Sequence, residues 1–383
     1  MSRKQTVLLV LVVIALTTCG VKLFDLSHAA AGYVSAEPET GALTIPAQRV
    51  TDLSASAGAA IRFAATAQPP ANCVAGGNYL WSNLSTCGWP SADNTGPNLS
   101  ACPGGILAIN SGSVTRTITA STANATISCQ NITGCLNITA ANVTVVNVKI
   151  ACSSGKTGTD ANGTSVINIS DGASATLTNV EVNGMSGVHA CVWHQGTSAT
   201  INKLNCYGVN DGVFSWADNS YSQTTGDNLL LQDSYLHDFT VKTANGHIDG
   251  YQTEGAANSQ ISHNTFLMTS DLGNGSDSAV AIWNSLRSTH DIVVTNNLIT
   301  GGGFAIYAED YSPSEASPAG GFTLTNVSFT NNKFSTHLFG GSCVGSFGVW
   351  FPRGAPSDQW RRSGNSVLET GVNLDGGNPS GCN

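Results

Sequence analysis

The sequence has few charged residues, which make up only 10% of its 383 residues. So few charges cannot supply the ion-paired surfaces of long exposed helices, whereas 42 glycines suit turns and strands. The formal net charge of −9 argues against nucleic acid and anionic lipid as partners, because both are negatively charged. An anionic polysaccharide would need local basic residues or a bridging cation.

The sequence contains no Cys-x-x-Cys pair, which disfavours a zinc site. Of its 11 cysteines, Cys19 lies in the expected export signal, which leaves 11 − 1 = 10. An even number of cysteines in an exported chain indicates disulfides. Pairing of near neighbours predicts three bonds, Cys73–Cys87, Cys191–Cys206 and Cys343–Cys382.

The N-terminal apolar run is too short for a membrane span. It covers residues 7–16, whereas a spanning helix needs about 20 apolar residues. Arg3 and Lys4 precede the run, and small residues up to Ala31 follow it, as in a secretory signal. We expect residues 1–31 to be a signal peptide or an N-terminal membrane anchor, and the protein to be a secreted or cell-surface monomer.

Residues 32–72 differ from the rest of the chain. They contain the pattern Glu37-x-Glu39-x-Gly41, which resembles the opening strands of carbohydrate-binding jelly-roll modules. The resemblance covers about 35 residues, whereas a jelly roll needs eight strands. We therefore expect a short β segment or a linker here, ahead of a main domain over residues 73–383.

The main domain contains an internal repeat. Apolar residues stand at positions 1 and 6 of a six-residue pattern, with polar or small residues at positions 3 and 4, which predicts a strand, a tight turn and a second strand. The first positions are Val145, Leu177, Ile201, Leu231, Ile261, Val294 and Phe329. Subtraction gives spacings of 32, 24, 30, 30, 33 and 35 residues. Seven copies at this period indicate a solenoid, whose stacked coils share one core.

This repeat resembles the pectin-lyase-like right-handed parallel β-helix over roughly residues 88–383. Residues 88–96 are similar to the start of exported bacterial β-helix proteins whose activity is mostly unassigned. The resemblance implies an all-β fold with an internal hydrogen-bonded ladder at one turn. The residues expected in this ladder are Ser234, Asn264, Asn297 and Asn332.

Three aspartates lie in the strands between the repeat copies. If each of these strands is one rung, Asp211, Asp249 and Asp277 form a column with a spacing of about 4.8 Å. Carboxylates this close cannot all stay charged, so one takes up a proton or a cation such as Ca²⁺ binds. We therefore predict these three residues as catalytic groups or metal ligands, with His247 as a base beside Asp249. The alternative is that the aspartates cap turns, since Asp is common before Gly.

Further polar and aromatic residues recur near the same strands. Exposed aromatic rings there would stack on sugars, whereas buried rings such as Tyr251 and Trp350 would fill the interior. The predicted substrate-binding residues are Trp216, Gln252, Glu254, Trp283, Tyr307, Glu309 and Asp310.

These residues favour an exported enzyme that degrades polysaccharides. A lyase would use a base and a cation, and a glycosidase would use two carboxyl groups. Neighbouring rungs would suit a retaining glycosidase, and Asp211 and Asp277, about 9.6 Å apart, an inverting one. Basic residues such as Arg287 are scarce, and the polygalacturonase motifs Asn-Thr-Asp, Asp-Asp, Gly-His-Gly and Arg-Ile-Lys are absent. The alternative is a non-catalytic surface protein that binds glycans.

Overall fold

The computed structural model describes residues 47–51, 59–63, 70–74, 77–153, 165–215, 226–240, 248–268, 278–309, 322–339, 343–351 and 360–378. Contacts divide the chain into two units, residues 1–68 and 69–383. In the first unit, strands β1 (Ala47–Thr51) and β2 (Ala59–Phe63) form an antiparallel pair. Within the described ranges, no helix is long and apolar enough to cross a membrane. The predicted signal or anchor, residues 1–31, lies outside them.

The second unit is built almost entirely of parallel strands. Its only helices are short: α2 (Ala71–Val74), α3 (Gly77–Ser82), η2 (Leu99–Ala101) and η3 (Pro103–Gly105), among the described residues. The first strands are β3 (Ala108–Asn110), β4 (Thr117–Ala120), β5 (Thr126–Ser128), β6 (Gln130–Thr133), β7 (Cys135–Ile138), β8 (Val143–Ala151), β9 (Ser165–Ile169), β10 (Ser174–His194) and β11 (Ser198–Ser215).

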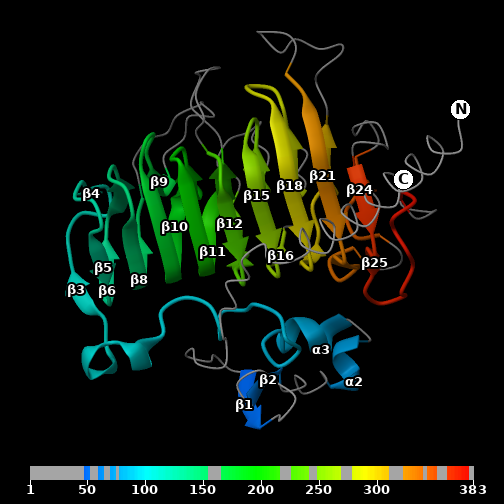
Figure 1. Ribbon diagram of the computed structural model, residues 1–383, viewed down its shortest axis with the longest axis horizontal. Coiled ribbons are helices and arrows are strands. Elements are labelled where there is room, and N and C mark those ends of the chain that lie inside the picture. The colour runs from blue at the N-terminus through cyan, green and yellow to red at the C-terminus, as the bar shows by residue number, and fades with distance from the viewer. Residues whose placement is uncertain are drawn as a thin grey trace, which may run out of the picture. The chain divides into compact units, whose positions relative to one another are not determined.

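The strands become shorter after β11 and recur in groups of three. They are β12 (Leu229–Gln232), β13 (Tyr235–Leu236), β14 (Asp249–Thr253), β15 (Ala257–Ser262), β16 (Thr265–Leu267), β17 (Ser278–Trp283), β18 (Thr289–Thr295), β19 (Leu298–Thr300), β20 (Phe304–Glu309), β21 (Leu324–Thr330), β22 (Lys333–Ser335), β23 (Gly348–Trp350), β24 (Trp360–Ser363) and β25 (Ser366–Val367). Each strand from β12 to β22 pairs in parallel with the strand three further on (Figure 1).

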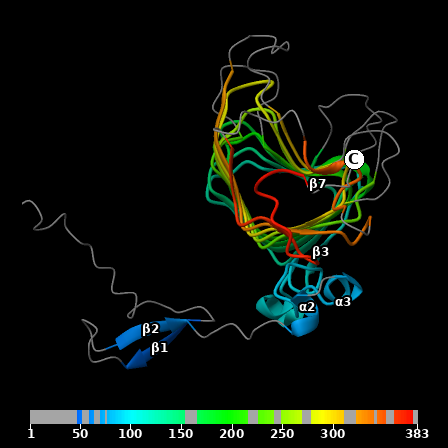
Figure 2. The same ribbon diagram turned by 90° about the vertical axis from the view of Figure 1, so that its right-hand side faces the viewer.

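The pairing produces three sheets around one interior (Figure 2). We call them the β12, β13 and β14 sheets. The β12 sheet contains β12, β15, β18, β21 and β24; the β13 sheet contains β13, β16, β19, β22 and β25; and the β14 sheet contains β14, β17, β20 and β23. The long strands β10 and β11 contribute to all three sheets, because different parts of each pair with different neighbours.

The predicted repeat alignment is confirmed residue by residue. Each first position pairs with the first position of the next copy, from Val145 with Leu177 to Val294 with Phe329. All seven are fully buried in the main core. The apolar pattern specifies this register because a shift by one residue would turn every side chain to the opposite face.

The predicted ladder is confirmed and is longer than expected. Asn264, Asn297 and Asn332 are fully buried, and each accepts the backbone N–H of the preceding rung at its Oδ1. Asn365 continues the ladder by accepting from the Asn332 N–H at 3.2 Å. Ser234 begins it, with its hydroxyl accepting the Leu204 N–H at 3.1 Å. The ladder satisfies buried donors at a turn where no strand partner is available.

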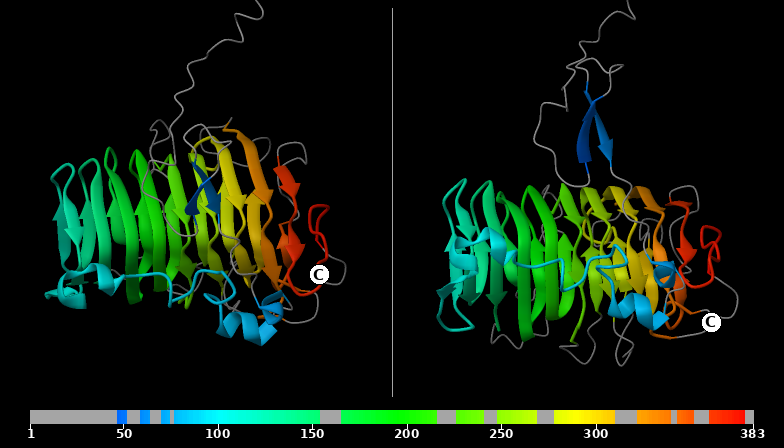
Figure 3. Two further views of the ribbon diagram at one scale, coloured as in Figure 1. Left: turned by 60° about the horizontal axis from the view of Figure 1, so that its bottom comes forward. Right: turned by 90° about the horizontal axis from the view of Figure 1, so that it is seen from below.

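The segment over residues 77–105 runs along the outer side of the β13 sheet (Figure 3). Leu80 and Leu84 pack with Tyr235 and Leu298 in a small apolar cluster of their own. At its edge, His263 contacts the Gly88 carbonyl oxygen at 2.9 Å and stacks against the neighbouring Trp89 ring. This segment therefore covers the β13 sheet and leaves the outer side of the β14 sheet to other residues.

Four disulfides lie within the described residues. Two confirm predicted pairs, Cys73–Cys87 and Cys191–Cys206, whereas Cys102–Cys129 and Cys135–Cys152 were not predicted. Cys343 is also disulfide-bonded. Its predicted partner Cys382 lies outside the described residues. Four bonds of this kind suit an oxidising compartment.

Candidate functional site

The β14 sheet brings two of the predicted aspartates together. Strands β11 and β14 pair at Val213 and Tyr251. Asp211 and Asp249 each lie two residues before this pair, so they lie opposite one another. Asp249 pairs with Ser278 of β17. The column therefore continues through Ser278 and not through Asp277, because the pairing of β14 with β17 is offset by one residue from the predicted alignment. Asp277 and His247 lie outside the described residues.

Asp211 is fully buried and accepts two hydrogen bonds. Its Oδ1 accepts the Asp249 N–H at 2.6 Å, and its Oδ2 accepts from the Asn210 amide at 2.7 Å. The Nε2 atom of His189 lies 3.0 Å from the same Oδ2. Asp211 thus links two strands through its hydrogen bonds and also contacts one imidazole.

Asp249 is 1% exposed and accepts a hydrogen bond from the Ser278 hydroxyl. Within the described ranges, no three His, Cys, Asp or Glu side chains converge in a way that could hold a metal ion. The third predicted Ca²⁺ ligand, Asp277, is not among the described residues.

The glycines that follow the two aspartates have a packing role. A Cβ atom at Gly212 would lie 2.1 Å from the Gly250 carbonyl oxygen, and one at Gly250 would lie 2.5 Å from a ring carbon of Phe266. Only glycine fits so close to the interior. The Asp-Gly pairs therefore stand at strand positions, with Asp249 the first residue of β14, and the alternative that they cap turns does not hold.

His189 is a candidate that the sequence argument missed. It lies on β10, one residue before Ala190, which pairs with Asp211. Its side chain is 23% exposed, and its ring lies 5.0 Å from that of Phe214. Its Nε2 atom is the ring nitrogen in contact with Asp211. The other nitrogen, Nδ1, has no hydrogen-bond partner among the described residues. No repeat pattern marks His189, since its contact with Asp211 depends on the register between β10 and β11.

The described members of the predicted substrate-binding set lie along the β14 sheet. Gln252 pairs with Ala281, which pairs with Tyr307, and Trp283 pairs with Glu309. Glu254 follows β14 directly and accepts from the Ser285 hydroxyl at 2.6 Å. The sheet therefore gathers these residues as predicted. Trp216 and Asp310 lie outside the described residues.

The aromatic side chains of this sheet divide between interior and surface. Tyr251 and Trp350 belong to the main core, as the packing alternative predicts. Trp283 and Tyr307 are half-buried and meet edge to face, with ring centroids 5.6 Å apart. Tyr307 also stacks on Phe351 at 3.9 Å. Partly exposed rings beside carboxylates are suited to contact sugar faces and hydroxyls.

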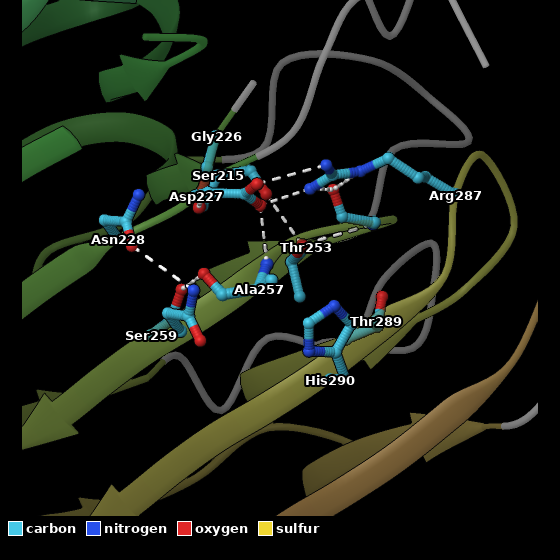
Figure 4. A network of polar contacts seen from close by, with 12 residues as sticks. Ser215, Gly226, Asp227, Asn228, Thr253, Ala257, Ser259, Arg287, Thr289 and His290 are labelled. Carbon is cyan, nitrogen blue, oxygen red and sulfur yellow. Dashed lines mark hydrogen bonds and ion pairs between the residues drawn. The ribbon is translucent and has the colours of Figure 1, made fainter. Parts of the chain in front are cut away.

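Arg287, one of the scarce basic residues, is occupied by protein contacts (Figure 4). Its guanidinium forms a two-pronged ion pair with Asp227 and donates twice to the Gly255 carbonyl oxygen, at 3.0 and 3.2 Å. Asp227 also accepts the Ala257 N–H at 2.7 Å. The network connects the segments that lead into β12, β15 and β18, and it holds the guanidinium in a fixed position.

His194 contacts Asp227 of the same network. Its Nε2 is 2.8 Å from the Asp227 carbonyl oxygen, and its side chain is fully buried. Burial lowers the pKa of His194 to about 4, so the ring is neutral at pH 7. A neutral, enclosed imidazole of this kind has a structural role.

The sequence matches no known protein-family model, and no curated protein matches it either.

Proposed function

We propose that the second unit is a right-handed parallel β-helix of the pectin-lyase-like type. Three strands per repeat, pairing in parallel with the next repeat, support this fold. Crossovers between parallel strands are right-handed in about 98% of cases. The fully buried asparagine ladder also supports the resemblance. The disulfides and the basic, then apolar, N-terminal sequence support export from the cell.

We propose that the protein is an exported carbohydrate-active enzyme that cleaves a polysaccharide on the outer side of the β14 sheet. The observation that carries this proposal is a single face with His189 in contact with Asp211, Asp249 on the next strand, and half-buried Trp283 and Tyr307. An imidazole and carboxylates provide acid–base chemistry, and the rings provide a sugar platform.

The contacts favour a lyase over a glycosidase. Asp211 and Asp249 occupy neighbouring strands, about 4.8 Å apart, which is near the separation in retaining glycosidases. However, Asp211 is fully buried and already accepts two hydrogen bonds, which disfavours it as a nucleophile or acid. His189, with a free ring nitrogen among the described contacts, suits proton removal from carbon.

A non-catalytic glycan-binding protein is the second candidate. The complete burial of Asp211 and the 1% exposure of Asp249 favour it, because a catalytic carboxyl group must reach its substrate. Under this alternative the acids only stabilise the strands, and the aromatic residues bind the glycan.

A polysaccharide panel separates these functions. The protein is incubated with neutral, esterified and acidic polysaccharides, with Ca²⁺ or with a chelator. A lyase produces reducing ends together with ultraviolet-absorbing unsaturated products, and a hydrolase produces reducing ends alone. Binding without product supports the second candidate, and neither product nor binding refutes both. Asp249→Asn should abolish cleavage, while Asp291→Asn should retain it, because the half-exposed Asp291 lies on β18 of another sheet.

A further inference from the structure

We infer that His189 is the proton-accepting residue of this site and that Asp211 positions its imidazole. The inference rests on the proposed polysaccharide-cleaving function and assigns a specific role within it. It also changes the role of Asp211 from acid or metal ligand to positioning residue.

The position of Asp211 is fixed by contacts other than His189. The Asn210 amide and the Asp249 N–H hold its two oxygens at 2.7 and 2.6 Å. The Nε2 atom of His189 lies 3.0 Å from its Oδ2. A carboxylate can only accept a hydrogen bond, so this contact favours the Nε2–H form of His189 and leaves Nδ1 to take up a proton.

The backbone of His189 is held firmly as well. Its neighbours Val188 and Ala190 are almost completely buried, and both pair with β11. The Cys191–Cys206 disulfide joins β10 to β11 two residues further along. The ring itself rests against Phe214. Placement on rigid strands with a buried partner is the arrangement that a proton-transfer group requires.

The chemical step is an elimination without oxidation or reduction. Nδ1 of His189 takes the proton from the sugar carbon next to the carboxyl group. The electron pair of that C–H bond forms the C=C bond, and the glycosidic oxygen leaves with the C–O bonding pair and receives a proton from water. The proton on His189 is then lost to solvent, which restores the base.

The kinetic test compares His189→Gln with a matched control. His290 also pairs with an aspartate, Asp291, at 2.8 Å, but it lies on β18 and not on the β14 sheet. His189→Gln should lower kcat by about 10²–10⁴-fold, the range of acid–base catalysis, with little change in KM. His290→Gln should change neither constant by more than about twofold.

Asp211→Asn tests the positioning role. The new amide can still accept the Asp249 N–H through its oxygen, but it presents an NH₂ group to His189. We expect the imidazole to change to the Nδ1–H form, with kcat lowered at least tenfold. Nitrogen NMR of the ring, without substrate, should show the proton on Nε2 in the unmodified protein and on Nδ1 in the variant. Circular dichroism confirms that each variant is folded.

The outcomes distinguish this inference from the proposed function. If the unmodified protein cleaves no polysaccharide of the panel, the proposed function fails, and the catalytic role of His189 fails with it. If it cleaves one and His189→Gln keeps more than a tenth of kcat, only the inference fails. A ring proton on Nδ1 in the unmodified protein would likewise overturn the positioning role of Asp211.

Discussion

Removing one amide from the buried ladder should be strongly destabilising, and Asn297 is the best position to test it. Asn297 is fully buried. Its Oδ1 accepts from the Asn264 N–H at 2.9 Å and from the Asn264 amide at 3.0 Å. Its own amide donates to the Ile261 carbonyl oxygen at 3.0 Å and to Asn332 Oδ1 at 2.9 Å.

The loss in the free energy of unfolding for Asn297→Ala depends on which buried polar groups lose their hydrogen-bond partner. The Asn264 amide still donates to the Leu231 carbonyl, and Asn332 Oδ1 still accepts the backbone N–H of residue 297. The Asn264 N–H loses its acceptor, and the Ile261 carbonyl oxygen loses the donor that the Asn297 amide supplies. At about 1–3 kcal/mol for each unpaired buried group, the expected loss is about 4 kcal/mol.

Urea denaturation followed by circular dichroism measures this loss. The control is Gln260→Ala on the neighbouring strand β15, because Gln260 is exposed and should cost no more than about 0.5 kcal/mol. Asn297→Ser should lie between the two, since Ser234 fills the same position with a hydroxyl that both accepts and donates. A loss below about 1 kcal/mol for Asn297→Ala would refute the reasoning.

Two further predictions concern charged groups. Asp227→Asn breaks the largely buried pair with Arg287 and should cost about 3–5 kcal/mol in chemical denaturation; an unchanged midpoint would contradict this. The hydrogen bond that His263 donates to the Asp233 carboxylate raises the pKa of His263 above its ordinary value of 6.5. The stabilisation should therefore be complete below pH 6.5 and be lost as pH rises through the raised pKa. The denaturation midpoints of His263→Gln and the unmodified protein should converge at high pH; divergence there would argue against a charged His263 beside Asp233.

The sequence alone determined the repeating part of the molecule. The seven copies predict the strand register because each places one apolar residue inward at the same point, and the register pairs them as aligned. The ladder was predictable for the same reason, since Ser234, Asn264, Asn297 and Asn332 hold a fixed place in the pattern. The near-neighbour disulfides Cys73–Cys87 and Cys191–Cys206 also followed from spacing.

Only the tertiary structure decided what the β14 sheet carries. The segments before its strands vary in length, so no sequence pattern fixes how these strands align. Asp249 pairs with Ser278 and not with the predicted Asp277. The contact between His189 and Asp211 joins two strands, and sequence spacing cannot show which side chains meet across them. Burial likewise depends on what surrounds a residue, and Asp211, predicted as a groove acid, is completely enclosed.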